Sequence, residues 1–199
     1  MDILLVTKNN GKLNEFKRLL HKYNVNFLTL KDLNINDDII EDGNSFIENA
    51  YIKAKTISVK YNYVTLADDS GLCVDSLGGA PGIYSARYAV EHNDVANNKK
   101  LLDELKNKED RSAHFTCALC LYYPNGKYLT LEDYAYGTIL KSPRGYDGFG
   151  YDPLFYSTEG KKTFAEMEGY EKDLYSHRAN AIRKLGELVD ENFNIKWFS

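Results

Sequence analysis

The sequence predicts an α/β fold in which helices flank a mixed β-sheet and two lobes enclose an active-site cleft. Three observations lead to this class. Strand and helix patterns alternate at the start of the chain, and two long strands joined by a tight turn lie in its middle. Hydrophobic residues make up 43% and charged residues 27% of the 199 positions, as in globular proteins. We expect one domain, residues 1–199, built of the two lobes.

The first three elements are predicted as strand, helix and strand. Residues 3–7, ILLVT, form a short apolar run typical of a buried strand. The helix is expected over residues 11–23 and a second strand near residues 25–29. The apolar side chains of the helix recur on one face at helical spacing: Leu13, Phe16, Leu20 and Tyr23.

A second helix is predicted over residues 44–61, with Asn44 or Ser45 as its N-cap. Its apolar stripe consists of Phe46, Ala50, Ala54 and Ile57. Residues 63–69 then form a strand that runs into two acids. Residues 70–88 are expected as a loop with short strands, because glycine and small residues dominate them.

The middle of the chain predicts a helix followed by a β-hairpin. A polar helix is expected around residues 94–107, and two long strands over residues 112–123 and 127–140. The connection YPNGK contains Asn125-Gly126, a strong signal for a hairpin turn.

The last part begins with the loop GYDGFGYDP at 145–153, whose glycines and proline exclude a regular helix or central strand. A short strand at 154–156 follows. The final helix is expected from about 176 to 192, with Ser176 as its cap. Its inward side chains are Ile182, Leu185 and Val189.

The charge and the apolar pattern limit the partners. The net charge of −4 argues against nonspecific nucleic-acid binding, which depends on a basic surface. The first apolar run is too short for a signal peptide, and no apolar stretch approaches the roughly 20 residues of a membrane span. We therefore expect a soluble, cytoplasmic protein without a nucleic-acid or membrane partner.

Cys117 and Cys120 form a C-x-x-C pair, a pattern that in other proteins binds zinc or forms a redox disulfide. The residues around them alternate as in a strand, where side chains three apart point to opposite faces. We therefore expect the two thiols to diverge and not to form such a site.

Residues 7–12, TKNNGK, lie between the first strand and its helix. Unpaired N–H groups at a helix N-terminus suit an anion such as phosphate. Thr7 and Asn9 offer polar contacts, and Lys12 adds a positive charge. The alternative is an ordinary helix cap with a solvated lysine.

The sequence contains two acidic pairs. Glu41-Asp42 precedes the second helix, and Asp68-Asp69 ends the strand predicted at 63–69. Adjacent carboxylates raise each other's pKa, and a cation or a role as a base relieves the repulsion. Mg²⁺ takes oxygen ligands and needs only one or two carboxylates beside substrate phosphates. The alternative is a loop with solvated acids.

The glycine-rich loop carries groups that suit a planar base. Phe149 and Tyr151 can stack on a ring, and Asp152 can accept hydrogen bonds from ring N–H groups. The alternative is that both rings anchor the loop in the core.

Lys172, His177 and Arg178 lie close to the start of the last helix. We expect the His–Arg pair to be exposed and to donate hydrogen bonds to a keto oxygen of a purine. The alternative is surface charge beside a helix cap.

Together, a phosphate clamp, an acid cluster, a stacking loop and a set of base-edge donors match a nucleoside triphosphate. The chain resembles the inosine triphosphate pyrophosphatase family, the Ham1-type enzymes that remove noncanonical purine nucleotides. The resemblance runs nearly end to end, through TKNNGK (7–12), SFIENAYIKAK (45–55), ADDSGLCVDSLGGAPGIYSARY (67–88), GFGYDPLF (148–155) and SHRANAI (176–182).

The resemblance implies a central elongated mixed sheet, a cleft between lobes and a homodimer. It also implies Mg²⁺-dependent hydrolysis of ITP, dITP and XTP to the monophosphate and pyrophosphate, which cleanses the nucleotide pool. Glu41 is similar to a metal ligand of the family. Asp69 is similar to its acidic catalytic residue, a general base or metal ligand, and Lys12 would assist by offsetting charge. The substrate contacts carried over by position are Thr7, Asn9, Lys12, Ser70, Phe149, Gly150, Tyr151, Asp152, Lys172, His177 and Arg178.

Two other functions are weighed against this one. A nucleotide-sensing module without chemistry would need the stacking loop and the phosphate clamp but not the acids at 41, 68 and 69. A phosphohydrolase of ordinary dNTPs would not need the donors of the SHR block at 176–178.

Overall fold

The structure, a computed structural model, describes residues 2–23 and 25–193. The chain divides into two compact units. Unit 1 comprises the described residues of 1–69, 117–133 and 181–199, and unit 2 comprises 70–116 and 134–180.

The described residues form one six-stranded sheet with the order β2-β1-β3-β4-β5-β6. β1 is parallel to both β2 and β3, whereas β5 and β6 are antiparallel, so the sheet is mixed. The strands are β1 (Asp2–Val6), β2 (Asn26–Thr29), β3 (Val64–Val74), β4 (Ser112–Tyr122), β5 (Tyr128–Ile139) and β6 (Phe155–Ser157).

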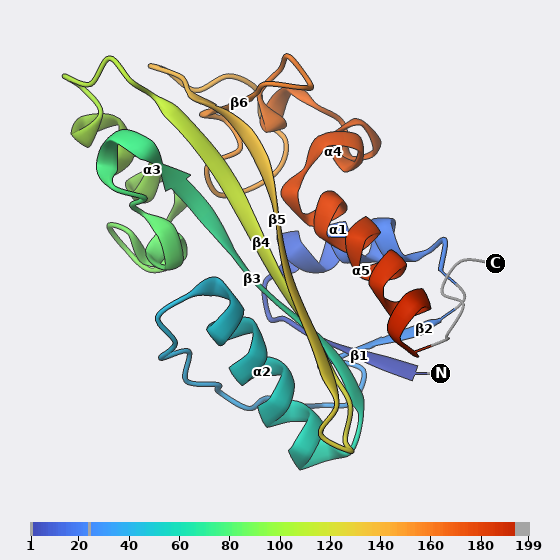
Figure 1. The fold of residues 1–199 in the computed structure, drawn as a ribbon. Helices are drawn as coiled ribbons and strands as arrows, with labels where there is room; N and C mark the ends of the chain where they lie inside the picture. The colour runs from blue at the N-terminus through green and yellow to red at the C-terminus, as the bar shows by residue number, and fades with distance from the viewer. Residues whose placement is uncertain (1, 24, 194–199) are drawn as a thin grey trace. The chain divides into compact units, whose positions relative to one another are not determined.

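Helices separate most of the strands along the chain (Figure 1). They are α1 (Asn10–Leu20), α2 (Phe46–Tyr61), α3 (Asp94–Glu104), α4 (Gly169–Tyr175) and α5 (His177–Phe193), and short 3-10 helices lie at Asp75–Leu77, Gly82–Arg87 and Phe164–Glu166. The predicted α/β class, with a mixed sheet flanked by helices, is therefore confirmed. The single domain and the cleft between lobes stay predictions.

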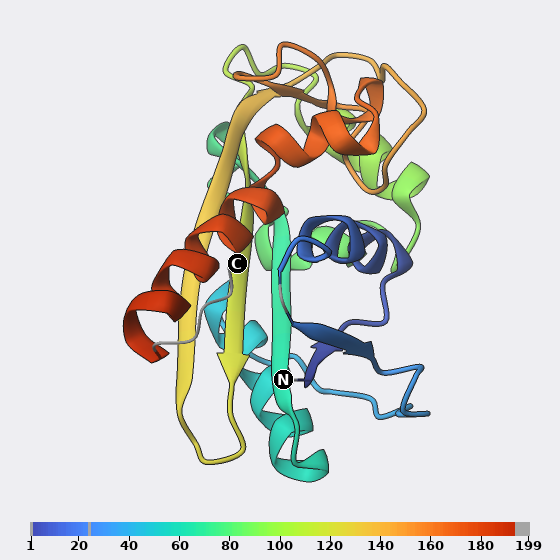
Figure 2. The same ribbon diagram turned by 90° about the vertical axis from the view of Figure 1, so that its right-hand side faces the viewer.

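In unit 1, helices cover both faces of the strands. α2 lies on one side, and α1 and the part of α5 that belongs to this unit lie on the other (Figures 1 and 2). The apolar stripe predicted for α2 is buried, and Ser45 rather than Asn44 caps the helix by accepting from the Glu48 N–H. The carboxyl end of β1 and the acids Asp68 and Asp69 of β3 therefore belong to a unit whose strands are covered by helices on both faces.

Unit 2 has a hydrophobic core of its own. Leu101 of α3 and Leu105, just beyond this helix, are fully buried in it, as are Phe155 of β6 and Phe164. Tyr151, from the glycine-rich loop, belongs to the same cluster. This core fixes α3 and one end of the loop within the unit.

Four elements differ from their predictions. β3 continues to Val74, because Leu72 and Val74 are fully buried and compensate for the weak strand preference of Gly71. Asp68 and Asp69 therefore lie inside a strand. α1 and α3 end three residues early, at Leu20 and Glu104, and α4 was not predicted.

Cys117 and Cys120 are both buried in β4, and neither forms a disulfide bond. The expectation that the two thiols diverge and form no zinc or redox site stays a prediction. Among the described residues, no helix combines the length and hydropathy that a membrane span requires.

Candidate active site

The residues expected to bind phosphate lie where β1 passes into α1. Asn9 is the N-cap of α1, and its Oδ1 accepts from the Lys12 N–H at 3.0 Å. Thr7 Oγ1 accepts from the Asn9 N–H at 3.2 Å. The capping role is thus realised, and it holds the turn in a shape that places Lys12 in the first turn of the helix.

Lys12 is not a solvated surface lysine. Its Nζ lies 2.9 Å from Oδ2 of Asp68, whose side chain is only 1% exposed. The buried carboxylate fixes the direction of the ammonium group, which has three donors and can contact a phosphate oxygen besides Asp68.

Asp69, the next residue of β3, has a different set of partners. Lys53 Nζ lies 3.8 Å from Asp69 Oδ1 and 2.8 Å from Glu41 Oε2. Adjacent strand residues point to opposite faces, and accordingly Asp68 pairs with a lysine of α1 and Asp69 with a lysine of α2. The structure therefore brings Glu41 and Asp69 together through one shared cation.

Asn49 binds the other carboxylate oxygen of Asp69. Its Nδ2 donates to Asp69 Oδ2 at 3.0 Å, and its Oδ1 accepts from the Gly43 N–H at 2.9 Å. Gly43 approaches so closely that a Cβ there would lie 2.7 Å from Asn49 Oδ1. One amide therefore ties Asp69 to the segment that carries Glu41.

The charges of this cluster shift two pKa values. Burial raises the pKa of Asp69, and Lys53, Lys12 and the Asn49 hydrogen bond offset only part of the effect. Burial alone would lower the pKa of Lys53, but Asp69, Asp68 and Glu41 outweigh it, so the pKa of Lys53 is raised. Lys53 thus stays charged, and Asp69 is a stronger base than a solvated aspartate.

The oxygen donors of Glu41 and Asp69 suit a hard cation. No group of three or more His, Cys, Asp or Glu side chains that could hold a metal occurs among the described residues. Mg²⁺ does not need such a group, because it is commonly held by one or two carboxylates together with substrate phosphates and water.

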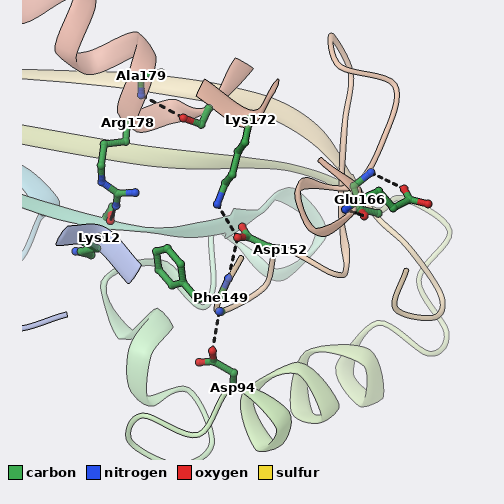
Figure 3. Close-up of polar contacts among 12 residues, drawn as sticks. Lys12, Asp94, Phe149, Asp152, Glu166, Lys172, Arg178 and Ala179 are labelled. Atoms are coloured by element: carbon green, nitrogen blue, oxygen red, sulfur yellow. Dashed lines mark hydrogen bonds and ion pairs between the residues drawn. The ribbon is translucent and has the colours of Figure 1, made fainter. Parts of the chain in front are cut away.

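The expected base-binding residues belong to unit 2 (Figure 3). Asp152 Oδ2 accepts from the Phe149 N–H at 3.0 Å and from Lys172 Nζ at 2.6 Å. Lys172 Nζ also lies 5.1 Å from the centre of the Phe149 ring, within cation–π distance. Gly148 is required here, since a Cβ would lie 2.1 Å from Asp152 Oδ2.

The two aromatic side chains of the loop have different environments. Phe149 is half-buried, whereas Tyr151 is buried in the core of unit 2 and its OH donates to Ser85 O at 2.8 Å. Tyr151 therefore takes the anchoring role that was the alternative for both rings, and Phe149 is the ring with accessible surface.

The His–Arg pair at the start of α5 is buried, so the expectation of an exposed pair was wrong. His177 stacks on Phe115 with a centroid distance of 4.7 Å, and Arg178 Nη2 donates to Ser70 Oγ at 2.8 Å. Ser176 Oγ accepts from the Ala179 N–H at 3.2 Å, which confirms the predicted cap. Packing against Phe115 makes the burial of His177 favourable, which spacing alone does not reveal.

Lys53 and Asn49 are site residues that sequence reasoning did not single out. Both lie in the motif SFIENAYIKAK, at a spacing of four that places them on one face of α2. Each is next to an alanine of the apolar stripe. A lysine and an asparagine at positions that border a buried stripe are the signal that was available.

The chain is similar over nearly its whole length to proteins of one family. The model of the Ham1 family matches residues 3–188. A Bacillus licheniformis protein named dITP/XTP pyrophosphatase is 48% identical over 96% of this chain and 98% of its own length. A Bacillus subtilis protein of the same name is 43% identical over 95% and 97%. The structure of the Staphylococcus aureus Ham1 protein has a TM-score of 0.86 and 38% identity, covering 96% of this chain and 99% of that one.

Proposed function

The chain belongs to the Ham1 family, and on this premise we propose that it hydrolyses ITP, dITP and XTP to the monophosphate and pyrophosphate. It is thus a hydrolase that removes noncanonical purine nucleotides from the nucleotide pool. The names of the Bacillus relatives support this substrate class. The observation that carries the proposal is the cluster in which Lys53 joins Glu41 to Asp69.

We propose Mg²⁺ as the cofactor and Glu41 and Asp69 as its protein ligands. The two carboxylates already share one cation, the Lys53 ammonium, so positive charge is favourable at this place. When bound, Mg²⁺ would offset negative charge on the triphosphate oxygens.

Asp69 is proposed to orient or deprotonate the attacking water. Asn49 holds Oδ2, and Oδ1 points toward Lys53. The water oxygen forms a bond to the α-phosphorus, and the bond from that phosphorus to the α–β bridging oxygen breaks. The proton passes to Asp69, and pyrophosphate leaves. Lys12, held by Asp68, stabilises the charge that develops on the phosphate oxygens.

Thr7 and Asn9 are proposed to contact the triphosphate, and unit 2 supplies the proposed base contacts. Phe149 and Gly150 would cover the face of the ring, and Tyr151 would anchor the loop. The polar side of the base pocket would be formed or supported by five residues: Ser70, Asp152, Lys172, His177 and Arg178. A purine with a 6-keto oxygen accepts from Arg178 or Lys172, whereas the amino group of ATP leaves such a donor unpaired. Mismatches of this kind discriminate by up to about 10⁴-fold.

A homodimer in the cytoplasm, with neither nucleic acid nor a membrane as partner, completes the proposal. Family resemblance supports the dimer, and light scattering would test it against the chain mass of 22.7 kDa.

The first experiment is pyrophosphate release from ITP, XTP, GTP and ATP, with Mg²⁺ and with EDTA. We expect Mg²⁺-dependent release from ITP and XTP and little from ATP. Equal release from all four would refute the base selection. Binding of ITP without any release would indicate the sensing module instead.

A further inference from the structure

The conformation of the base-binding loop depends on side-chain contacts, some of which come from outside the loop. Gly145, Gly148 and Gly150 all have positive φ values, of 83°, 80° and 62°. Glycines lose more conformational freedom on folding than other residues, so the loop sequence by itself does not favour this one conformation. Further contacts, from within the loop and from other elements, are needed to select it.

Two side chains of α3 supply such contacts. Asp94 Oδ2 accepts from the Gly150 N–H at 2.7 Å, and Asn98 Nδ2 donates to Gly150 O at 2.9 Å. Asp94 and Asn98 are four residues apart and therefore lie on one face of the helix. Both polar backbone groups of a single glycine are thus bound by one helix.

The backbone of Phe149 is held as well. Its N–H donates to Asp152 Oδ2 at 3.0 Å, and its carbonyl accepts from the Asp152 N–H at 3.2 Å. All four backbone groups of Phe149 and Gly150 therefore have partners within unit 2. Figure 3 shows Asp94 bound to the loop beside Phe149, and Lys172 and Asp152 on the other side.

α3 is a firm support for these contacts. Its Leu101 is fully buried in the core of unit 2, together with Leu105 just beyond the helix. Asn97 is buried and accepts from the Ala89 and Val90 N–H groups at 2.7 and 3.1 Å. The loop is therefore attached to a helix that the core and a second loop both fix.

The Asp94 side chain is not needed to cap α3. Asn93 is the N-cap, and its Oδ1 accepts from the Ala96 N–H at 2.9 Å. A carboxylate bonded to a backbone N–H is one of the stronger kinds of hydrogen bond. The contact with Gly150 is thus a separate use of Asp94.

We propose that Asp94 and Asn98 are positioning residues that hold Phe149 in place for stacking on the purine ring. The inference rests on the proposed function, because it assumes that Phe149 covers the base. Stacking is tolerant of base identity. Loss of the clamp formed by Asp94 and Asn98 should therefore weaken the binding of every purine nucleotide by a similar factor.

The test compares Asp94→Ala, Asp94→Asn and Asp103→Ala in steady-state kinetics with ITP and ATP. Asp94→Ala removes the acceptor and should raise KM for both nucleotides about tenfold while kcat stays within about threefold. Asp94→Asn keeps an acceptor oxygen and should restore most of the affinity. Asp103, an exposed acid on the same helix, controls for loss of a charge.

Binding of inosine monophosphate in EDTA, followed by calorimetry, gives a readout that does not depend on turnover. Weaker binding by Asp94→Ala and Asn98→Ala but not by Asp103→Ala would support the clamp. Unchanged KM and binding in both variants would overturn it, as would equal loss in Asp103→Ala. If the unmodified protein bound and hydrolysed no purine nucleotide, the proposed function itself would fail.

Discussion

The buried carboxylate of Asp69 has a cationic partner, Lys53, and a neutral partner, Asn49. Lys53 offsets its charge, and Asn49 fixes its orientation. Because Asn49 also binds the Gly43 N–H, the same amide links the orientation of Asp69 to the segment that holds Glu41. At the scale of single residues, the proposed catalysis therefore depends on groups that bind no substrate.

Asp69→Asn is expected to lower kcat by more than tenfold without unfolding the protein. The amide keeps the shape and the contact with Asn49 but is no longer a base. Asp38→Asn, at a carboxylate that is 98% exposed, is the matched control and should leave kcat unchanged. Activity above a tenth of that of the unmodified protein would remove the proposed role of Asp69.

The same variant has a defined effect on stability. Since the pKa of Asp69 is raised, the folded chain binds this proton more tightly than the unfolded chain. The stability that this group contributes is therefore lost as the pH rises above its ordinary value of 3.8. Asp69→Asn should have a Tm equal to or above the unmodified protein at pH 7, with a smaller difference near pH 4.

Arg178 is expected to govern the choice of base. Its side chain is only 1% exposed, so Ala would leave a cavity, and Arg178→Met is the better variant because it keeps much of the volume. We expect the ratio of kcat/KM for ITP over ATP to fall at least tenfold. Lys184→Met, at an exposed lysine on α5, should leave the ratio unchanged. An unchanged ratio in Arg178→Met would show that the base is recognised elsewhere.

At the scale of residues, sequence reasoning recovered the charged groups but not their pairing. Lys12 was predicted to add a positive charge to the phosphate-binding turn, but its ion pair with Asp68 was not predicted. Lys53 was not predicted at all. Helical spacing identifies which residues share a face, but only the packing of α2 beside β3 brings Lys53 to Asp69.

At the scale of elements, the glycine-rich loop offers a matched pair of substitutions. Gly148 and Gly150 have φ values of 80° and 62°, so alanine at either position is strained by about 1–2 kcal/mol. Only at Gly148 would the added Cβ collide, with Asp152 Oδ2. Gly150 has no atom within 4 Å of that position.

Gly148→Ala should therefore lose more ITP affinity and more thermal stability than Gly150→Ala. The reason is that Asp152 would have to leave both Lys172 and the Phe149 N–H. Binding titrations and Tm values of the two variants test this. Equal losses would mean that backbone strain alone, and not the position of Asp152, determines the effect.

Elements with strong local signals were predicted well. The cap and stripe of α2 and the turn between β4 and β5 depend on residues close together in sequence. The end of β3 and the short helix α4 were missed, because burial of Leu72 and Val74 and the packing of Gly169–Tyr175 are decided by distant parts of the chain.

At the scale of the molecule, the two units share their longest elements. β3 contributes Val64–Asp69 to unit 1 and Ser70–Val74 to unit 2, and β4, β5 and α5 are divided in the same way. Asp69, proposed for the chemistry, and Ser70, bonded to Arg178, are therefore consecutive residues. If either unit unfolded, β3, β4 and β5 would each lose the part that lies in that unit.

The chain is consequently expected to unfold in one cooperative transition, because β3, β4, β5 and α5 each run through both units. Calorimetry should give a van't Hoff enthalpy equal to the calorimetric one. Cys117 and Cys120, buried in unit 1, should react with a thiol reagent only as the far-UV circular dichroism is lost, since burial raises the pKa of Cys120 to about 12. Cys73 in unit 2 is half-buried and should react first. Two separate transitions, or reaction of the buried pair before the loss of helix and strand, would show that the units are independent domains.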